Sequence, residues 1–523
     1  MPWKSIFMIL LCKIPLNVMN AKDDLLSLIQ SLNQTEKRYF KIYAQRHVIG
    51  KSNAYIELFE AVETAGKKGD YNEIAIKQKL KKVIPASSYA VIKNYLYNLI
   101  LKSMRAYHED DTTTHAISQR MLDIEFLMQK GLYEKALKML NTTKQSARTL
   151  NRNFLLIEIL SIQRRLMRHT LEKSSEATLQ ASSEEEMVCL QKITLELKYH
   201  HLYDQLFVML QKYYQFRDEK LLNKVQKIMK DPLITEPPQY LSFESVIMYN
   251  LIHSDHAHLT GDTHKSKLHR KKIIEAYEEY PKMQADESLR YLNSLNNYLT
   301  SCFHSNDLDE VSKTLQKIKS IVPANLEEES QIFKNSTYLE LLFYIQTNQF
   351  VLAKKLVPVI ESGLKKFGSK LPKGRILTIY YNIAVLFLVI EEFDECLTWV
   401  NHIIFGEWEN VRQDIQDSAK MLQIILHYEL GNVDLLDSLM RSTRRQLKES
   451  ERLYEMETLL LQLVKKLIRT PGKKERNQAL EQVKQKISDL SNINGQVITG
   501  TEELLLWIES RLNGRSIADN MGK

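Results

Sequence analysis

The chain has 523 residues, of which 44% are hydrophobic and 26% are charged, and its formal net charge is +8 at pH 7. This mild positive excess over a long chain is not the charge pattern of a dedicated nucleic-acid binder. The 15 glycines and 11 prolines fall far below average usage of roughly 7% and 5%, and strand-type alternation is scarce, so we expect an all-α protein. The length exceeds one ordinary core, which favours a helical repeat array whose repeats bury their apolar faces on their neighbours.

Residues 1–18 are predicted to be an optional or non-native extension. The apolar run at residues 6–12 imitates a signal peptide, but Lys13 and Pro15 interrupt it and no small-residue cleavage pattern follows. The alternative interpretation is a weak secretion or anchoring signal. No segment approaches the ~20 apolar residues that a membrane span needs, so we expect no membrane span.

Residues 19–108 are predicted to form a separate helical unit. Asn33 with Glu36 three residues later is typical of a helix start. A regular apolar stripe after Pro85 indicates another helix. This stripe consists of Ile92, Tyr95, Leu96, Leu99, Ile100 and Met104. A polar break at residues 108–114 then separates this unit from the rest of the chain.

One pattern recurs further along the chain: a polar or small anchor residue, an apolar residue at +2, a small or apolar one at +5 and an apolar one at +9. The copies are Gly131-Tyr133-Ala136-Leu140, Asn306-Leu308-Val311-Leu315, Asn348-Phe350-Ala353-Val357, Glu391-Phe393-Cys396-Val400, Gly431-Val433-Leu436-Met440 and the degenerate Gly261-Thr263-Ser266-Arg270. From Gly261 onward the anchors lie 45, 42, 43 and 40 residues apart. A period of about 40 to 45 residues is typical of stacked helical hairpins, with each anchor at a turn. Interpolation predicts two more turns near Ser174 and Arg217, and the polar residues 173–186 are predicted to be an exposed loop.

Residues 380–400 resemble a tetratricopeptide repeat, with an aromatic, an apolar and a small residue on the first helix and a small residue on the second. The matching residues are Tyr380, Ile383, Ala384, Phe387, Phe393, Cys396 and Val400. The resemblance extends over residues 115–450 and is specific for about 330–440, although the period is longer than the family's 34 residues. It implies a right-handed α-solenoid of stacked helical hairpins, a TPR-like fold, with a concave groove lined by the first helix of each hairpin. Residues 451–523 are expected to form capping helices, one of them over 502–512, and a short tail.

The resemblance implies a non-enzymatic scaffold that binds a protein or peptide partner in the concave groove. The groove positions that can be carried over are Asn293, Asn296, Asn297, Asn335, Tyr338, Tyr381 and Asn382. Asparagine amides can both donate to and accept from the main chain of an extended peptide. The lysines and arginines with which the family clamps a C-terminal carboxylate are missing from these places. The alternative is that these side chains are hydrated or pack on a neighbouring repeat.

A second functional hypothesis is a regulator that contacts nucleic acid, a partner that the overall charge makes less expected. The contact would be made through residues 19–108 or through the basic stretch at 441–486, with the repeats as a sensor or dimerisation arm. The basic residues of this stretch are Arg441, Arg444, Arg445, Lys465, Lys466, Lys473, Lys474 and Arg476. Acidic residues interleave with them, which is also typical of a solvated helical surface. The sequence specifies neither the partner nor the oligomeric state.

No motif in the chain predicts catalysis or a bound cofactor. Phosphate-binding glycine loops and GxSxG are absent, so we expect neither an enzyme nor a cofactor. The histidines near Gly261 are the one candidate metal site, and they are expected instead to be exposed residues beside a turn. They are His253, His256, His258, His264 and His269, with Asp255 among them.

The four cysteines are scattered along the chain and form no CxxC pair, so neither a disulfide framework nor a zinc site is expected. They are Cys12, Cys189, Cys302 and Cys396. Cys396 occupies the +5 place of a repeat, where a packed core thiol is predicted. A reducing compartment fits this pattern, and we expect a cytoplasmic location.

Overall fold

The computed structural model describes residues 24–45, 54–109, 112–169, 176–216, 219–239, 241–368, 371–408, 411–449, 455–494 and 500–521. All regular secondary structure in these ranges is helical, with no strand, and this confirms the all-α prediction. Residues 1–18, Cys12 and the interpolated turns at Ser174 and Arg217 lie outside the described residues.

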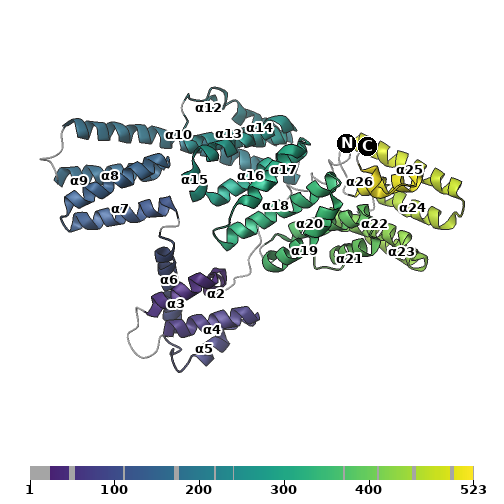
Figure 1. The fold of residues 1–523 in the computed structure, drawn as a ribbon, viewed down its shortest axis with the longest axis horizontal. Helices are drawn as coiled ribbons and strands as arrows, with labels where there is room; N and C mark the ends of the chain where they lie inside the picture. The colour runs from purple at the N-terminus through teal and green to yellow at the C-terminus, as the bar shows by residue number, and fades with distance from the viewer. Residues whose placement is uncertain are drawn as a thin grey trace.

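The first five helices in the described ranges have a hydrophobic core of their own (Figure 1). They are α2 (Asp24–Ser31), α3 (Gln34–Gln45), α4 (Ala54–Lys68), α5 (Glu73–Lys79) and α6 (Tyr89–Tyr107). Ile29, Phe40 and Phe59 lie at the centre of this core and are fully buried. The predicted helix start at Asn33 is confirmed: its side chain accepts a hydrogen bond from the Glu36 amide, and Glu36 accepts one from the Asn33 amide. This reciprocal pair satisfies two amides that the helix leaves without a partner.

The remaining helices share a second, larger hydrophobic cluster. They are α7 (Thr113–Gln129), α8 (Tyr133–Thr149), α9 (Asn153–His169), α10 (Glu176–Phe216), α11 (Glu219–Met229), α12 (Pro232–Thr235), α13 (Phe243–Leu259), α14 (Thr263–Glu279), α15 (Pro281–Asp286), α16 (Ser288–His304), α17 (Leu308–Ser320), α18 (Leu326–Gln346), α19 (Phe350–Phe367), α20 (Lys373–Val389), α21 (Phe393–Ile404), α22 (Gln413–Glu429), α23 (Val433–Glu449), α24 (Glu455–Arg469), α25 (Lys473–Asn494), α26 (Thr501–Asn513) and α27 (Ile517–Asn520). Neighbours along the chain pack as pairs.

The six repeat anchors mark the turns of six helical hairpins. All six have a positive φ, between 54° and 77°, and in each hairpin the second helix begins two residues after the anchor. At Asn348, for example, its amide donates to the Ile345 carbonyl and the next amide, of Gln349, donates to the Tyr344 carbonyl. This is the Schellman arrangement, which ends a helix with one left-handed residue. The +5 and +9 side chains of all six copies are at most 8% exposed, so the repeat pattern located both the turns and the core.

The longest helix, α10, contradicts one expectation from the sequence. The exposed loop predicted over 173–186 is wrong from Glu176 onward, because a single helix of 41 residues begins there. The acidic side chains at its start are held by the preceding hairpin: Glu185 accepts a hydrogen bond from Arg148 at 2.6 Å, and Glu186 pairs with Arg164. These pairs stabilise a helical conformation in a stretch whose composition resembles a loop.

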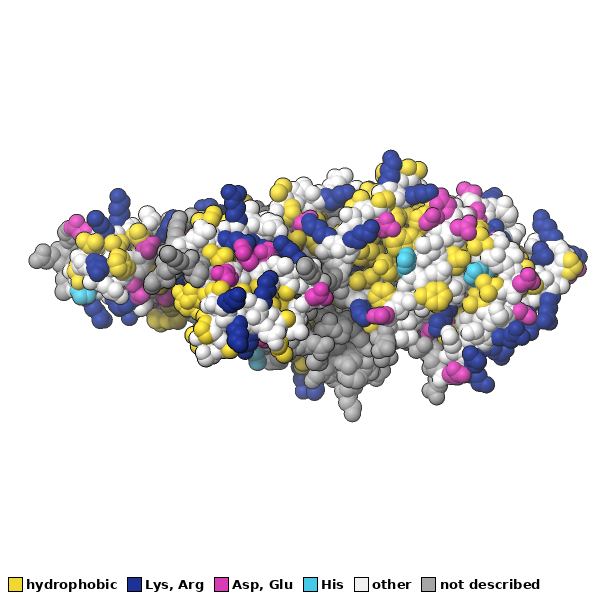
Figure 2. Space-filling model, turned by 90° about the horizontal axis from the view of Figure 1, so that it is seen from below, with side chains coloured by type: hydrophobic (Ala, Val, Ile, Leu, Met, Phe, Trp, Pro, Cys, Tyr) yellow, Lys and Arg dark blue, Asp and Glu magenta, His cyan; other side chains and the backbone are white. Residues whose placement is uncertain are grey.

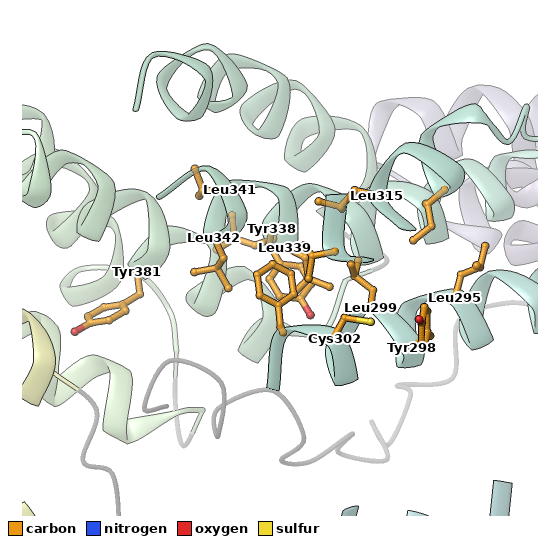
Figure 3. Close-up of a cluster of buried hydrophobic side chains, with 14 of the residues drawn as sticks. Leu295, Tyr298, Leu299, Cys302, Leu315, Tyr338, Leu339, Leu341, Leu342 and Tyr381 are labelled. Atoms are coloured by element: carbon orange, nitrogen blue, oxygen red, sulfur yellow. The ribbon is translucent and has the colours of Figure 1, made fainter. Parts of the chain in front are cut away.

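Helices α16, α18, α20 and α22, the first helices of four consecutive hairpins, each contact the next. We call this set the A-row. Figure 3 shows Leu299 and Cys302 of α16 gathered with Tyr338 and Leu339 of α18, and all four side chains are buried. The A-row contains all seven of the predicted groove residues.

Candidate protein-binding surface

The open part of the A-row lies on α16. Asn293 and Asn297 are exposed there, and Asn296 between them is half-buried. The carbonyl of Asn297 accepts a hydrogen bond from the Arg270 guanidinium at 2.9 Å, so its backbone is held while its amide side chain faces solvent. These two asparagines are the predicted groove residues that a partner can reach directly.

The predicted residues on α18 lie inside the protein. Asn335 is 5% exposed and Tyr338 is 2% exposed. The guanidinium of Arg375, from the next A-row helix, lies 4.5 Å above the centre of the Tyr338 ring. Burial raises the pKa of Tyr338, and the neighbouring Arg375 charge partly opposes this rise. Tyr338 therefore joins α18 to α20.

Tyr381 and Asn382 on α20 are buried as well, at 2% and 1% exposure. Burial raises the pKa of Tyr381 well above its ordinary value, and the nearby Glu503 carboxylate raises it further. Figure 3 shows that Tyr381 lies apart from the cluster around Tyr338 and points toward the yellow C-terminal part of the chain. What covers this side chain is therefore a segment more than a hundred residues away in sequence.

Three of the predicted asparagines have a buried polar atom without a hydrogen-bond partner among the described residues. These atoms are Oδ1 of Asn296, Nδ2 of Asn335 and Nδ2 of Asn382, one on each of α16, α18 and α20. A buried polar group left without a partner costs about 1–3 kcal/mol, and native proteins contain few of them. The three amides therefore retain hydrogen-bonding capacity along the A-row.

The C-terminal segment, residues 500–521, covers the part of the A-row formed by α20 and α22. Trp507 of α26 is fully buried, and its indole nitrogen donates to Glu429 at the end of α22 at 2.6 Å. Arg511, one helical turn later, donates to the same Glu429 oxygen at 2.7 Å and pairs with Glu391 at 3.4 Å. Figure 1 shows α26 beside α22.

A small cavity lies beneath α26, between it and helices α20, α22 and α24. Its volume is about 20 Å³, close to the smallest space that holds one water molecule. Tyr381, Ser418 and Glu503 are the polar groups of its lining, and Met421, Leu422 and Met456 are among the apolar ones. Burial raises the pKa of Glu503 to about 7, although hydrogen bonds from its own backbone amide and from Tyr381 favour the charged form.

The histidines near Gly261 do not match the expectation of exposed residues beside a turn. Only His264 is exposed, and burial lowers the pKa of His258 and of His269 to about 4. The ring of His253 stacks on that of His269 with centroids 4.6 Å apart. Within the described ranges, no three histidine, cysteine, aspartate or glutamate side chains are grouped so as to hold a metal ion. Apart from His264, these histidines are packing residues of the α13–α14 hairpin.

Comparison with known protein families, with curated protein sequences and with solved structures finds no match to this chain. The tetratricopeptide resemblance therefore rests on the residues of the repeat pattern. None of the helices in the described ranges is both long enough and apolar enough to cross a membrane.

The contribution of the C-terminal segment to this surface was missed at the sequence level. The helix predicted over 502–512 is confirmed as α26, but it was expected to cap the end of the array. Its amphipathic pattern predicts that its apolar face packs against another part of the protein. Nothing in that pattern indicates α20 and α22 as the site of packing, since this contact joins segments far apart in sequence.

Proposed function

We propose that this chain is a non-enzymatic scaffold that binds a partner protein on the A-row, and that its hairpins form a right-handed, TPR-like α-solenoid with the A-row on the concave side. Six hairpins with one turn geometry support this arrangement, and from Gly261 onward their anchors are 40 to 45 residues apart. The three cysteines in the described ranges are free, buried thiols, which agrees with a reducing, cytoplasmic setting.

One observation carries the proposal: the A-row already holds a polypeptide segment on one part and is open on another. On α20 and α22 it accommodates α26, and on α16 it presents the exposed Asn293 and Asn297. A surface that receives a helix through a buried tryptophan has the anchor chemistry of protein–protein interfaces. Tyr381 on α20, which lines the cavity beneath α26, would come into play only where that cover is displaced.

The experiment is a nuclease-treated pull-down from native lysate with residues 19–523 as bait, followed by titration of the purified partner. The test variant is Asn293→Ala/Asn297→Ala, and the control is Asn141→Ala/Asn223→Ala, which removes two exposed asparagines from other helices. Losing two hydrogen bonds of about 1 kcal/mol each weakens binding by roughly tenfold or more. Equal binding by the test and control variants overturns the proposal.

A second candidate, nucleic-acid binding, is favoured by one observation. Arg441, Arg444, Arg445 and Lys448 are all exposed on α23, and their spacing places them on one helix face. Figure 2 shows basic and acidic side chains interspersed over most of the face in view. If this candidate is correct, an Arg441→Gln/Arg444→Gln/Arg445→Gln variant loses a binding activity that also weakens steeply with added salt. A protein partner held by the A-row is insensitive to these three changes.

A further inference from the structure

The C-terminal segment lies along the A-row as a bound ligand does, and does not simply close the end of the array. Within the segment, α26 packs against the preceding helix α25, where Lys484 pairs with Glu509 at 3.1 Å. The segment also contacts four places further back: Met456 on α24, Glu429 on α22, Glu391 after α20, and Asn348 after α18. The last contact is a hydrogen bond from the Asn348 side chain to the Met521 carbonyl. A capping element needs to cover only the final repeat, whereas this segment reaches back across three further hairpins.

We propose that residues 500–521 are a displaceable internal occupant of the A-row, which gives way to a partner protein presenting an amphipathic helix with a tryptophan and an arginine four residues apart. This inference rests on the proposed scaffold function and specifies the partner's chemistry. The tryptophan and arginine of such a helix would take the places of Trp507 and Arg511 at Glu429 and Glu391. Displacement would also uncover Tyr381, which lines the cavity beneath α26.

The polar contacts of the segment are of a kind that can be exchanged. Arg511 and Glu391 are about one-third exposed, at 31% and 30%, so water and salt screen their attraction and the pair adds little stability. A partner arginine can form the same pair at no net loss. Trp507 is the largest of the segment's buried side chains, which also include Ile508 and Ile517. A competing indole would recover both its apolar contact and its hydrogen bond to Glu429.

The packing of α26 against the A-row also leaves a buried polar atom without a hydrogen-bond partner among the described residues. The carboxyl group of Glu503 is buried beside the cavity, and its Oε1 has no hydrogen-bond partner among the described residues. A buried carboxyl of this kind favours its protonated form, as the raised pKa of Glu503 indicates. When the segment is released, Glu503 returns to its ordinary pKa of 4.5. The seated state then holds an additional proton between pH 4.5 and 7, so release becomes easier as the pH rises through this window.

The first test is hydrogen exchange on the full chain at pH 5.5 and 7.5, corrected for the intrinsic exchange rates. We expect the protection of α26 to fall by roughly tenfold or more from the lower to the higher pH in the wild type. The variant Glu503→Gln abolishes this change. The control Glu509→Gln keeps it, because Glu509 is a partly exposed residue of the same helix that pairs with Lys484 on α25. If the amides of α26 exchange no faster than those of α7 to α9 at either pH, the inference is overturned, because α26 would then open only together with the rest of the fold.

The second test adds a labelled peptide of residues 500–521 in trans. The full chain carrying Trp507→Ala/Arg511→Ala, whose own segment is weakened, is expected to bind this peptide at least tenfold more tightly than the wild type does. A peptide with the same two substitutions is the control and should not bind. If both peptides bind both chains equally weakly, the inference is overturned. Circular dichroism of the variant chain is the check that it is still helical, so that a loss of stability alone does not explain this result.

The two proposals fail in distinguishable ways. If the segment opens and the peptide binds in trans, but no cellular protein depends on Asn293 and Asn297, the internal occupant stands and the proposed scaffold function fails. If a partner is captured through α16 while α26 stays closed and the peptide does not bind, the scaffold function stands and the inference fails. A captured partner that the peptide displaces supports both.

Discussion

The α13–α14 and α20–α21 hairpins share one turn geometry, but the core of the first contains polar side chains and the core of the second is apolar. Both turn on a left-handed anchor, Gly261 in the first and Glu391 in the second. In α20–α21 the +5 and +9 places hold Cys396 and Val400, both fully buried, and the Cys396 thiol lies 3.1 Å from the Ala384 carbonyl.

In α13–α14 the same two places hold Ser266 and Arg270, which are 2% and 8% exposed. The Arg270 guanidinium donates to the Asn297 carbonyl and to the Ser301 hydroxyl at 2.9 and 2.8 Å, and it lies 3.7 Å from Asp255. The two hairpins therefore show that the turn sets the shape of a hairpin independently of which side chains its core contains. The core contents decide how the hairpin responds to mutation and to pH.

The largest effect is expected from removing the buried guanidinium. Arg270→Ala leaves Asp255 without its counter-charge and should lower the local unfolding free energy by about 3 kcal/mol, because breaking a buried pair strands the other charge. Val400→Ala at the equivalent place leaves only a cavity and should cost about 2 kcal/mol. Native-state hydrogen exchange of each hairpin measures both values. The double variant Asp255→Asn/Arg270→Met is the control and is expected to recover most of the loss. A smaller loss for Arg270→Ala than for Val400→Ala contradicts the comparison.

The next effect is a dependence on pH that only the polar hairpin has. Burial and the Arg270 charge lower the pKa of His258 and of His304 to about 4 from an ordinary value of 6.5. Between these values the unfolded chain binds more protons, so stability is complete above pH 6.5 and is lost as the pH falls toward 4. The raised pKa of Asp255 acts in the opposite direction. We expect α13–α14 to lose about 2 kcal/mol at pH 4.5, measured by hydrogen exchange, with α20–α21 as the internal reference. His258→Gln/His304→Gln should weaken the response and leave the part that His269 contributes, since the pKa of His269 is also lowered to about 4. Equal loss in both hairpins would contradict it.

Exchanging the +5 residues should have smaller effects of opposite sign. The Ser266 hydroxyl is buried without a hydrogen-bond partner among the described residues, so Ser266→Ala should stabilise α13–α14 by about 1 kcal/mol. Cys396→Ser places a more polar hydroxyl in an apolar core and should destabilise α20–α21 by about 1 kcal/mol. Thermal and urea unfolding, read together with local exchange, test the pair. A loss of stability in Ser266→Ala would mean that this hydroxyl has a partner after all.

The smallest effects are expected at the anchors. Gly261 has a φ of 77°, and Gly261→Ala should cost about 1 kcal/mol because a β-carbon disfavours this conformation. Glu391 adopts a φ of 58° despite its side chain, so Glu391→Gly should relieve strain and stabilise its turn by about 0.5 kcal/mol after the loss of the exposed pair with Arg511. Local exchange at each turn is again the measurement. The same sign at both anchors would show that turn strain does not control these hairpins.

The degenerate repeat shows how far the sequence could predict this fold. Its anchor located a turn correctly, since Gly261 and the glycines and asparagines of other anchors are residues that tolerate a left-handed backbone. Glu391 was located by spacing and by its apolar +2, +5 and +9 neighbours, because glutamate itself gives no such signal. In the sequence, Arg270 at a core position indicated only that this copy of the repeat is degenerate. Its meaning depends on Asp255, Asn297 and Ser301, which come from two other helices.

From the amino-acid sequence we could predict the all-α class, the positions of the six turns and the buried +5 and +9 places, because these depend on residues a few positions apart along one helix or turn. It also identified α26 as an amphipathic helix. Three features became visible only once the helices were packed together: α10 continues as one helix, Arg270 is paired in the core, and α26 lies across α20 and α22. The same holds for the predicted groove residues: the tetratricopeptide resemblance placed Asn293, Tyr338 and Tyr381 on successive first helices, whereas packing between distant segments determined which of them solvent reaches. These outcomes depend on long-range contacts, and no local pattern in the chain specifies the partners of such contacts.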